Sequence, residues 1–94
     1  MTHIIVNHKV QDYSAWKVEF DNFAEFRKSN GEKSFRILHP NDDLNDLTLF
    51  FEWDNENNAK TFLASTELKS TMQRAGVAEE PRIQFLNEVA QGTL

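Results

Sequence analysis

Apolar side chains alternate with other residues in four stretches of the chain, and each stretch predicts a β-strand. The four stretches are His3–Val10, Lys33–His39, Leu47–Trp53 and Pro81–Val89. Alternation places successive side chains on opposite faces of a sheet, so His8 shares a face with Val6 whereas Asn7 lies on the other. Leu47–Trp53 is the most hydrophobic of the four, and we expect it to be central and covered on both faces.

Between the first two strands the apolar period changes to that of a helix. Asp12 is a candidate N-cap, and Gly31, after a cluster of basic residues, is a candidate end. Aromatic residues recur between them at steps of three and four, which predicts one amphipathic helix with an aromatic stripe. The stripe consists of Trp16, Phe20, Phe23 and Phe26 or Arg27.

A second helical region follows Trp53. Asp54 or Asn55 is its expected N-cap, and its first apolar stripe consists of Ala59, Phe62 and Leu63. Ser65 is a fresh N-cap, so a second segment begins there and ends at Gly76. That segment carries Leu68, Met72 and Ala75 on one stripe.

The element order β-α-β-β-α-β predicts an α+β, ferredoxin-like fold over a single domain, residues 1–94. In this fold both helical regions cover one face of an antiparallel sheet. Pro40–Asp46 is the expected hairpin loop, and Ala90–Leu94 is the expected frayed tail. Because the strands carry apolar groups on both faces, we expect a second copy of the chain to cover the other face, giving a homodimer through the sheets.

Composition narrows the function classes. The chain has 94 residues, a formal charge of −5 and a pI near 5.1, which argues against nucleic acid as a partner. It has no Cys, which excludes disulfides, thiolate nucleophiles and Cys-ligated metals. Its first ten residues lack the apolar core of a signal peptide and no run suits a membrane helix, so we expect a cytoplasmic protein.

The stretches HIIVNHKVQDYSAWKVEFDNFAEFRKSNG and FRILHPNDDLNDLTLFFEWDNENNAKTFLASTELKSTM resemble the dimeric α/β-barrel superfamily, especially its antibiotic-biosynthesis-monooxygenase-like members. The best local signal is a strand ending in Trp53, then a helix with Ala59 to Leu63, then an S-x-E-L-K pattern at Ser65–Lys69. The resemblance implies a ferredoxin-like chain that pairs into a barrel. It does not fix the chemistry, because the superfamily hosts cofactor-free oxygenation, haem degradation, chlorite chemistry and isomerisation.

The resemblance also implies site residues. Relatives that oxygenate polyphenolic rings or degrade haem use an Asn on the first strand and a Trp at the end of the third, and Asn7 and Trp53 match these positions. Haem degraders further use a His as the iron ligand. Met72 stands at that position here, and a Met on an apolar helical stripe is usually core, which argues against haem.

Other candidates follow from the residues themselves. His8 and His39 are possible general bases because imidazole titrates near neutral pH, although each alone is more often structural. Tyr13 and Trp16 open the first helix and are candidates to line a cleft between helix and sheet, with a core role as the alternative. Arg36 is a candidate anion contact or, more commonly, half of a cross-strand ion pair with Glu52.

No metal site is expected. His3, His8 and His39 lack the close spacing of ligand motifs, and the acidic turn around Asp42 and Asp46 lacks the Gly and Glu of a calcium loop.

The sequence therefore favours a homodimeric barrel that binds a small aromatic or polyketide-like ligand in an aromatic-lined pocket. The leading hypothesis is oxygenation without metal, flavin or other cofactor. In it a neutral His or Asn deprotonates or stabilises a phenolate-like substrate, which reacts with oxygen in a dry cavity held by Trp53. The alternatives are a non-catalytic ligand-binding or structural dimer and a cyclase or isomerase.

Overall fold

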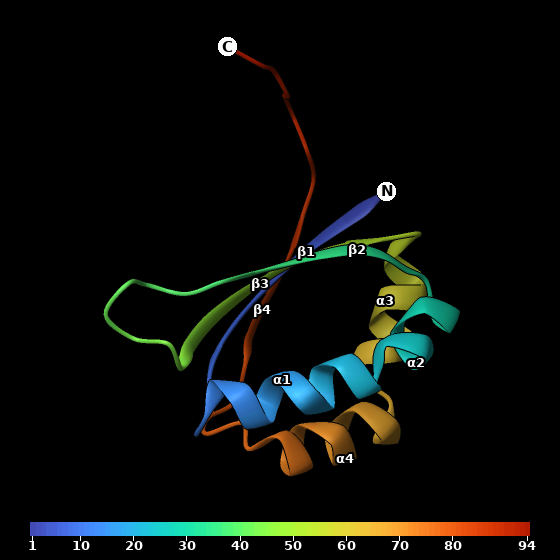
Figure 1. Ribbon diagram of the computed structural model, residues 1–94. Helices are drawn as coiled ribbons and strands as arrows, with labels where there is room; N and C mark the ends of the chain where they lie inside the picture. The colour runs from blue at the N-terminus through green and yellow to red at the C-terminus, as the bar shows by residue number, and fades with distance from the viewer.

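The computed structural model describes residues 1–94, in which eight elements build one sheet with helices on one side (Figure 1). In chain order they are β1 (Thr2–Lys9), α1 (Tyr13–Asn22), α2 (Ala24–Ser29), β2 (Glu32–Leu38), β3 (Asp46–Trp53), α3 (Glu56–Leu63), α4 (Thr66–Ala75) and β4 (Arg82–Leu86). The predicted ferredoxin-like α+β order is confirmed. None of the helices combines the length and the apolar character needed to cross a membrane.

The sheet has the strand order β2-β3-β1-β4, and all its pairings are antiparallel. Its register aligns the inward-facing residues, with Val6 opposite Leu49 on one side and opposite Ile83 on the other. β3 is central, as predicted. Residues 39–45 connect the antiparallel strands β2 and β3, so the expected hairpin loop at Pro40–Asp46 is confirmed except that Asp46 already belongs to β3.

The core lies between the sheet and the helices. Alternation on β1 and β3 points every second side chain toward the helices, where most of these side chains are buried. From the helices, Trp16 and Phe20 of α1 and Phe62 of α3 pack against them. The core residues of the two central strands are Ile4, Val6, Leu47, Leu49, Phe51 and Trp53.

Side-chain caps fix where three of the helices begin. Asp12 accepts a hydrogen bond from the Ala15 N–H at 2.9 Å, and Asn55 accepts from the Asn58 N–H at 2.8 Å. Ser65 accepts from the Leu68 N–H at 3.2 Å, which separates α3 from α4. Asp12 and Ser65 were predicted as caps, and Asn55 is one of the two predicted candidates, Asp54 or Asn55. Each supplies an acceptor to an N–H group that has no partner inside its helix.

The prediction of one helix from Tyr13 to Gly31 is wrong, because the chain breaks at Phe23 into α1 and α2. Phe23 has φ −91° and ψ 2°, and its N–H is shared between the carbonyls of Glu19 and Phe20. The Phe20 carbonyl also accepts a hydrogen bond from the Arg27 guanidinium. A side chain thus bonds a helix carbonyl at the break, which the hydrophobic period alone does not reveal.

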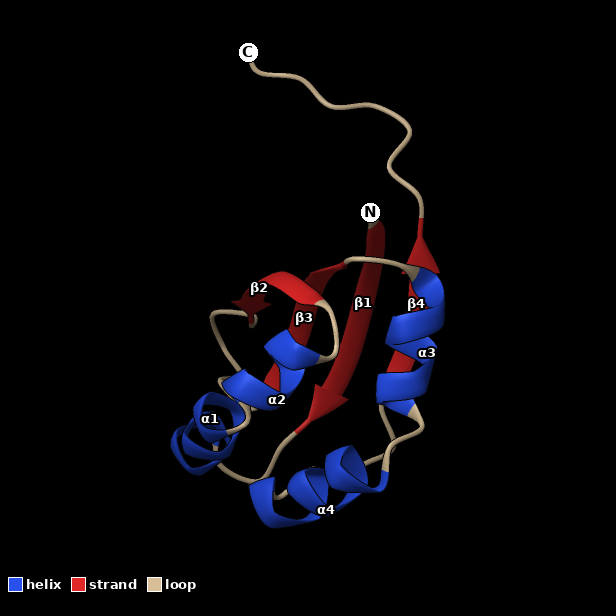
Figure 2. Cartoon of the chain, turned by 90° about the vertical axis from the view of Figure 1, so that its right-hand side faces the viewer, coloured by secondary structure: helices blue, strands red, loops and turns tan.

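The fourth strand is shorter than the predicted Pro81–Val89. β4 pairs with His3–Asn7 of β1 and ends at Leu86, because β1 offers few residues beyond His3 to pair with. Residues 87–94 have no strand pairing, and Figures 1 and 2 show them leading away from the sheet. The unpaired tail therefore begins three residues before the predicted Ala90.

Gly31 makes a close approach between two chain segments possible. Its backbone φ angle is 115°, which residues with a Cβ atom rarely adopt. A Cβ placed there would lie 2.3 Å from Asp54 Oδ1 and 2.8 Å from Trp53 Nε1. The turn before β2 can therefore pack against the end of β3.

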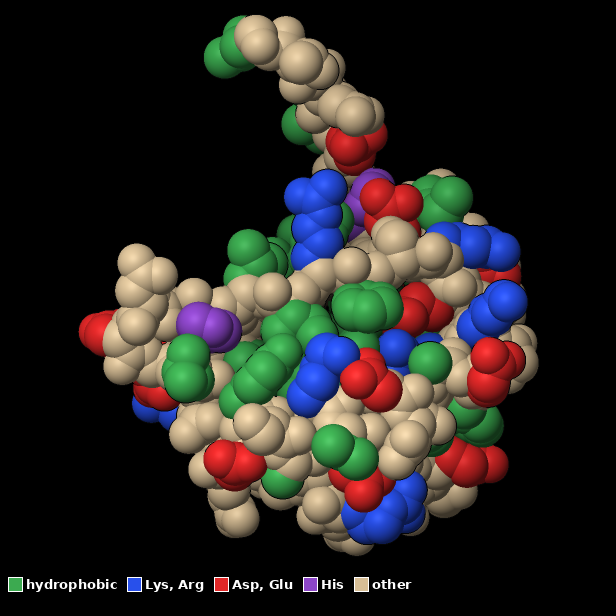
Figure 3. All heavy atoms as spheres, viewed as in Figure 1, with side chains coloured by type: hydrophobic (Ala, Val, Ile, Leu, Met, Phe, Trp, Pro, Cys, Tyr) green, Lys and Arg blue, Asp and Glu red, His purple; other side chains and the backbone are tan.

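The opposite face of the sheet has no cover within one chain (Figures 1 and 2). Ile5 of β1 and Phe50 of β3 are half-buried there, and Leu38 of β2 and Leu86 of β4 are exposed. On the helix side, Figure 3 shows apolar side chains that reach the surface between β2 and α1. Within one chain β3 is covered on the helix face, and cover of its other face by a second copy stays a prediction.

Candidate functional site

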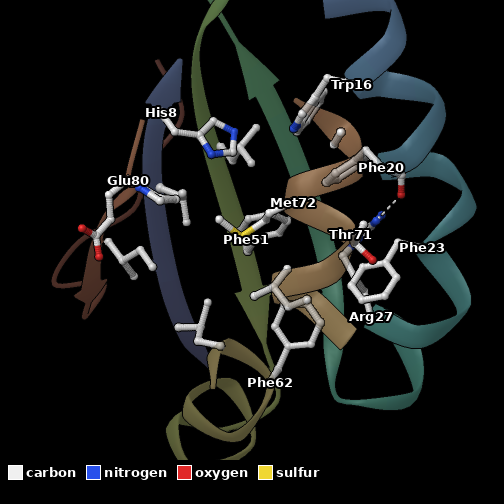
Figure 4. Close-up of a pocket in the computed structure, with 17 residues that line it drawn as sticks. His8, Trp16, Phe20, Phe23, Arg27, Phe51, Phe62, Thr71, Met72 and Glu80 are labelled. Carbon is white, nitrogen blue, oxygen red and sulfur yellow. Dashed lines mark hydrogen bonds between the residues drawn. The ribbon is translucent and has the colours of Figure 1, made fainter. Parts of the chain in front are cut away.

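A cavity of about 200 Å³ lies between the sheet and the helices (Figure 4). Twelve of the 17 residues that line it are hydrophobic. Its apolar walls include Val6 and Phe51 from the sheet and Trp16, Phe20 and Phe62 from the helices. The polar or charged lining residues are His8, Arg27, Thr71 and Glu80. A mainly apolar hollow with a few polar side chains is the usual form of a small-molecule site.

His8 is a buried polar residue in the cavity wall with no partner. Alternation on β1 turns its ring toward the helices, and 4% of the residue is exposed. Neither Nδ1 nor Nε2 forms a hydrogen bond. The ring meets Trp16 edge to face, with centroids 5.9 Å apart. Because a buried polar group without a partner costs free energy, this imidazole is available to a ligand.

Burial lowers the pKa of His8 below its ordinary value of 6.5, and the negative charge of Glu79 opposes this shift. The neutral imidazole is therefore the main form at pH 7. In that form one ring nitrogen donates a hydrogen bond and the other accepts one. His8 can thus accept a proton from a ligand hydroxyl, as a general base must.

Arg27 and Glu32 form a buried ion pair at the α2 side of the cavity. Arg27 Nε lies 2.9 Å from Glu32 Oε1 and 3.1 Å from Oε2. Both side chains are less than 10% exposed, and the Arg27 guanidinium stacks 3.6 Å from the centre of the Phe20 ring. Burial raises the pKa of Glu32, while the charge and hydrogen bonds of Arg27 lower it. Removing either partner should cost about 3–5 kcal/mol because it would leave a buried charge unpaired.

A groove beside α4 adjoins the cavity. Leu63, Leu68, Met72, Glu80 and Pro81 line both hollows. Glu79 lines the groove and Glu80 lines both, whereas Lys69 is the groove's one basic residue. The acidic pair should disfavour the entry of anions.

The structure brings two of the sequence-predicted site residues to the cavity, His8 and Trp16. Tyr13 and His39 lie outside its lining but near it. The Tyr13 ring is 6.0 Å from that of Trp16 and 6.4 Å from that of His39. His39 is exposed, and its Nδ1 lies 2.7 Å from the Pro40 carbonyl oxygen.

Asn7 and Arg36 lie on the uncovered face of the sheet, away from the cavity. The Asn7 amide donates to the Leu47 carbonyl at 3.0 Å, and its oxygen accepts from Arg82. Arg36 is exposed opposite Phe50 and forms no ion pair with Glu52, because the β2–β3 register sets Ser34 opposite Glu52. The cross-strand pair expected from the sequence is therefore absent.

Trp53 is packed one layer behind the cavity wall. It is 1% exposed, and its indole N–H donates to the Asn30 carbonyl at 2.9 Å. Its ring lies 4.8 Å from that of Phe62, which does line the cavity. Trp53 therefore supports the wall through Phe62.

Sequence reasoning missed Arg27, Thr71, Glu79 and Glu80 as site residues. The one available signal was Arg27, a charged residue on an otherwise aromatic helical stripe. Glu79 and Glu80 lie in the connection between α4 and β4, where no period points to a cavity.

No three His, Asp or Glu side chains cluster closely enough to hold an ion. Met72, which stands where the resemblance places the haem ligand of other members, lines the cavity.

No protein-family model matches the chain, and no curated protein matches it. Solved structures with the same fold do match. A protein from Bordetella bronchiseptica, provisionally described as an antibiotic biosynthesis monooxygenase, has a TM-score of 0.80 and 15% identity, over 95% of this chain and 97% of that one. SnoaB from Streptomyces nogalater, a cofactor-independent oxygenase, has a TM-score of 0.72 and 16% identity, over 99% of this chain and 95% of that one.

A third solved structure with this fold has no assigned activity. It is a Nitrosomonas europaea protein of unknown function, with a TM-score of 0.72 and 12% identity, over 99% of this chain and 93% of that one. The comparisons thus confirm the ferredoxin-like α+β fold of the chain. Since the same fold hosts different functions, they do not fix a substrate.

We predict that His8 titrates below pH 6.5 in the folded protein. The unfolded chain then binds a proton more readily, so the contribution of His8 to stability falls as pH drops below about 6.5. The pKa is measured from the His8 ring proton signal in an NMR titration. Glu79→Gln should lower the pKa further, because the Glu79 charge raises it.

Glu88→Gln is the control for that substitution, since Glu88 is exposed in the C-terminal tail and should leave the His8 pKa unchanged. A native His8 pKa at or above 6.5 would contradict the buried, unpaired state of the imidazole.

Proposed function

We propose that this protein is a cofactor-independent monooxygenase of small, uncharged phenols, which bind in the cavity with the hydroxyl at His8. The observation that carries the proposal is a buried imidazole with both nitrogens unpaired in the wall of an apolar cavity. SnoaB, which has the same fold, is described as a cofactor-independent oxygenase. That description supports the reaction type, and His8 supports the substrate class.

The size and polarity of the cavity limit the ligand. An apolar cavity of about 150 Å³ holds benzene, and pockets for drug-sized ligands begin near 300 Å³. At about 200 Å³ this cavity suits one aromatic ring or two fused rings. Its aromatic walls favour a flat ligand, and Glu79 and Glu80 at the groove favour an uncharged one.

The proposed reaction begins with proton transfer to His8. The imidazole takes the phenol proton, and the resulting phenolate gives one electron to dioxygen. The phenoxyl radical and superoxide combine at the ring carbon para to the oxygen. The coupling product is a peroxide anion, which takes the proton from protonated His8 and becomes a hydroperoxide. The hydroperoxide then loses the hydrogen of its para carbon and its outer oxygen as water, leaving a quinone. For 1-naphthol the balance is C10H8O + O2 → C10H6O2 + H2O.

The remaining sequence candidates take supporting places in this proposal. Trp16 forms the wall beside His8, and Trp53 holds Phe62 from behind. Tyr13 packs outside Trp16, and His39 lies at the surface beyond it. Asn7 and Arg36 belong to the sheet face that we assign to a partner subunit.

We predict oxygen uptake when the protein is mixed with 1-naphthol, with 1,4-naphthoquinone as the product. His8→Gln should lower kcat about 100-fold or more, the usual contribution of a general base. His39→Gln should keep kcat, because His39 is exposed and outside the cavity lining. The measurement is an oxygen electrode trace with product analysis by mass spectrometry, corrected for naphthol oxidation without protein.

The outcome separates the alternatives. Binding of 1-naphthol without oxygen uptake would identify a ligand-binding protein of the same fold. An isomeric product formed without oxygen would identify a cyclase or isomerase. Equal activity of wild-type protein and His8→Gln would remove His8 from the mechanism.

We further propose a homodimer that buries the uncovered sheet face, where Ile5 and Phe50 are half-buried and Leu38 is exposed. Light scattering after size exclusion should give about twice the 10.9 kDa chain mass. Phe50→Glu should produce monomer, because it places a charge in the apolar contact. Val18→Glu on α1 is the matched control, since Val18 is 58% exposed on the helix side. A wild-type monomer at micromolar concentration would contradict the assembly.

A further inference from the structure

We propose that Arg27 is the second polar contact of the ligand, donating a hydrogen bond to an acceptor oxygen at the α2 side of the cavity. This inference rests on the proposed function of the cavity. It adds a requirement to the ligand, which is a phenolic ring system that carries a conjugated carbonyl group and keeps the carbon para to its hydroxyl free to react.

Some N–H groups of the Arg27 guanidinium have no hydrogen-bond acceptor in the chain. A guanidinium has five N–H groups. The Nε N–H donates to Glu32, and one Nη1 N–H donates to the Phe20 carbonyl. Nη2 donates to no group of the chain, so three of the five N–H groups have no acceptor within it. The residue is 4% exposed and lines the cavity, so a ligand there is well placed to satisfy them.

The guanidinium is also held in place before any ligand binds. Glu32 fixes its Nε edge, and the Phe20 ring lies 3.6 Å from its central carbon. The Phe35 ring lies 5.6 Å from the same atom. A donor that its neighbours already hold in place loses little conformational entropy when it binds a ligand. Most of the free energy of its hydrogen bond therefore contributes to binding affinity.

Arg27 and His8 approach the cavity from different elements. Figure 4 shows His8 projecting from β1 and Arg27 coming from α2, with apolar side chains such as Phe51 and Met72 also lining the space. Of the other polar lining residues, Thr71 already accepts a hydrogen bond from Arg74 at 3.0 Å. Glu80 is exposed to solvent. The two buried ionisable side chains of the lining with hydrogen-bonding capacity left are therefore an acceptor, the His8 ring, and a cationic donor, Arg27.

This pairing has a chemical consequence. When His8 takes the proton of a phenol, the negative charge spreads through the ring to a conjugated carbonyl oxygen. A cationic donor at that oxygen stabilises the charge as it develops. Arg27 thus selects for the carbonyl and favours ionisation of the ligand.

The test compares two probes that differ at one position, 4-ethylphenol and 4-hydroxyacetophenone. Wild-type protein should bind 4-hydroxyacetophenone about tenfold more tightly, the usual effect of a hydrogen bond to a charged donor. The double substitution Arg27→Met with Glu32→Leu removes both buried charges together. It should abolish the preference while leaving the affinity for 4-ethylphenol within about twofold. Affinities are measured by isothermal titration calorimetry, with folding checked by circular dichroism.

Two further variants keep the test decisive. Lys28→Met removes a positive charge from the same helix at an exposed position, and it should keep the preference. If the double variant does not fold, Arg27→Lys takes its place. It keeps a cation near Glu32 but loses the planar set of donors, so it should reduce the preference.

Equal binding of both probes by wild-type protein would overturn the role of Arg27 and leave the proposed phenol site standing. A preference that survives in the folded Arg27 variant would also overturn it. Binding of neither probe would contradict the proposed phenol site, and the inference would fall with it.

Discussion

Side chains on β1 and β3 alternate between the two faces of the sheet, and this alternation determines which residues can reach the cavity. One helix layer covers one face of the sheet, so a side chain on these strands points either toward the helices or toward the uncovered face. His8 points inward and its neighbour Asn7 points outward. A shift of one residue in the register of β1 would exchange the two and remove the imidazole from the cavity.

The cavity combines an apolar interior with polar groups that the fold leaves partly unsatisfied. His8 has no hydrogen bond, and Arg27 has donors to spare. The Phe-rich surroundings make water a poor substitute for a ligand, because a buried water needs several polar partners. Arg27 pairs with Glu32 and also donates to the Phe20 carbonyl across the helix break at Phe23. These two contacts hold the charged guanidinium in one orientation at the site.

Much of the fold was predictable because it follows from local patterns. Alternation located the strands, and Asp12, Asn55 and Ser65 each cap a helix as their positions suggested. The break at Phe23 was not predictable, because it accompanies a bond between Arg27 and a carbonyl one turn away from the break. The uncovered face was predictable because the strands carry apolar residues on both sides. The subunit that we propose covers it is not part of a single chain.

The site was predictable only in part. Alternation placed His8 on the same face as Val6, but only the structure shows that this face turns toward the helices. Trp16 was a candidate for the cleft from its place on the helical stripe, and it lines the cavity. The side of the sheet on which the cavity lies depends on how bulky side chains from α1, α3 and α4 fill the space, which no spacing reveals. Trp53 is one layer behind the wall for the same reason, since Phe62 occupies the place between it and the cavity.

The most direct test of the central claim is an NMR titration of nitrogen-labelled protein with 4-ethylphenol. If the cavity binds a phenol through its buried imidazole, a ring nitrogen of His8 should shift as the ligand saturates. Intermolecular contacts should then join the ligand to Trp16 and to the Met72 methyl group. A ligand that binds without moving the His8 nitrogens, or that contacts only surface residues, would contradict the account.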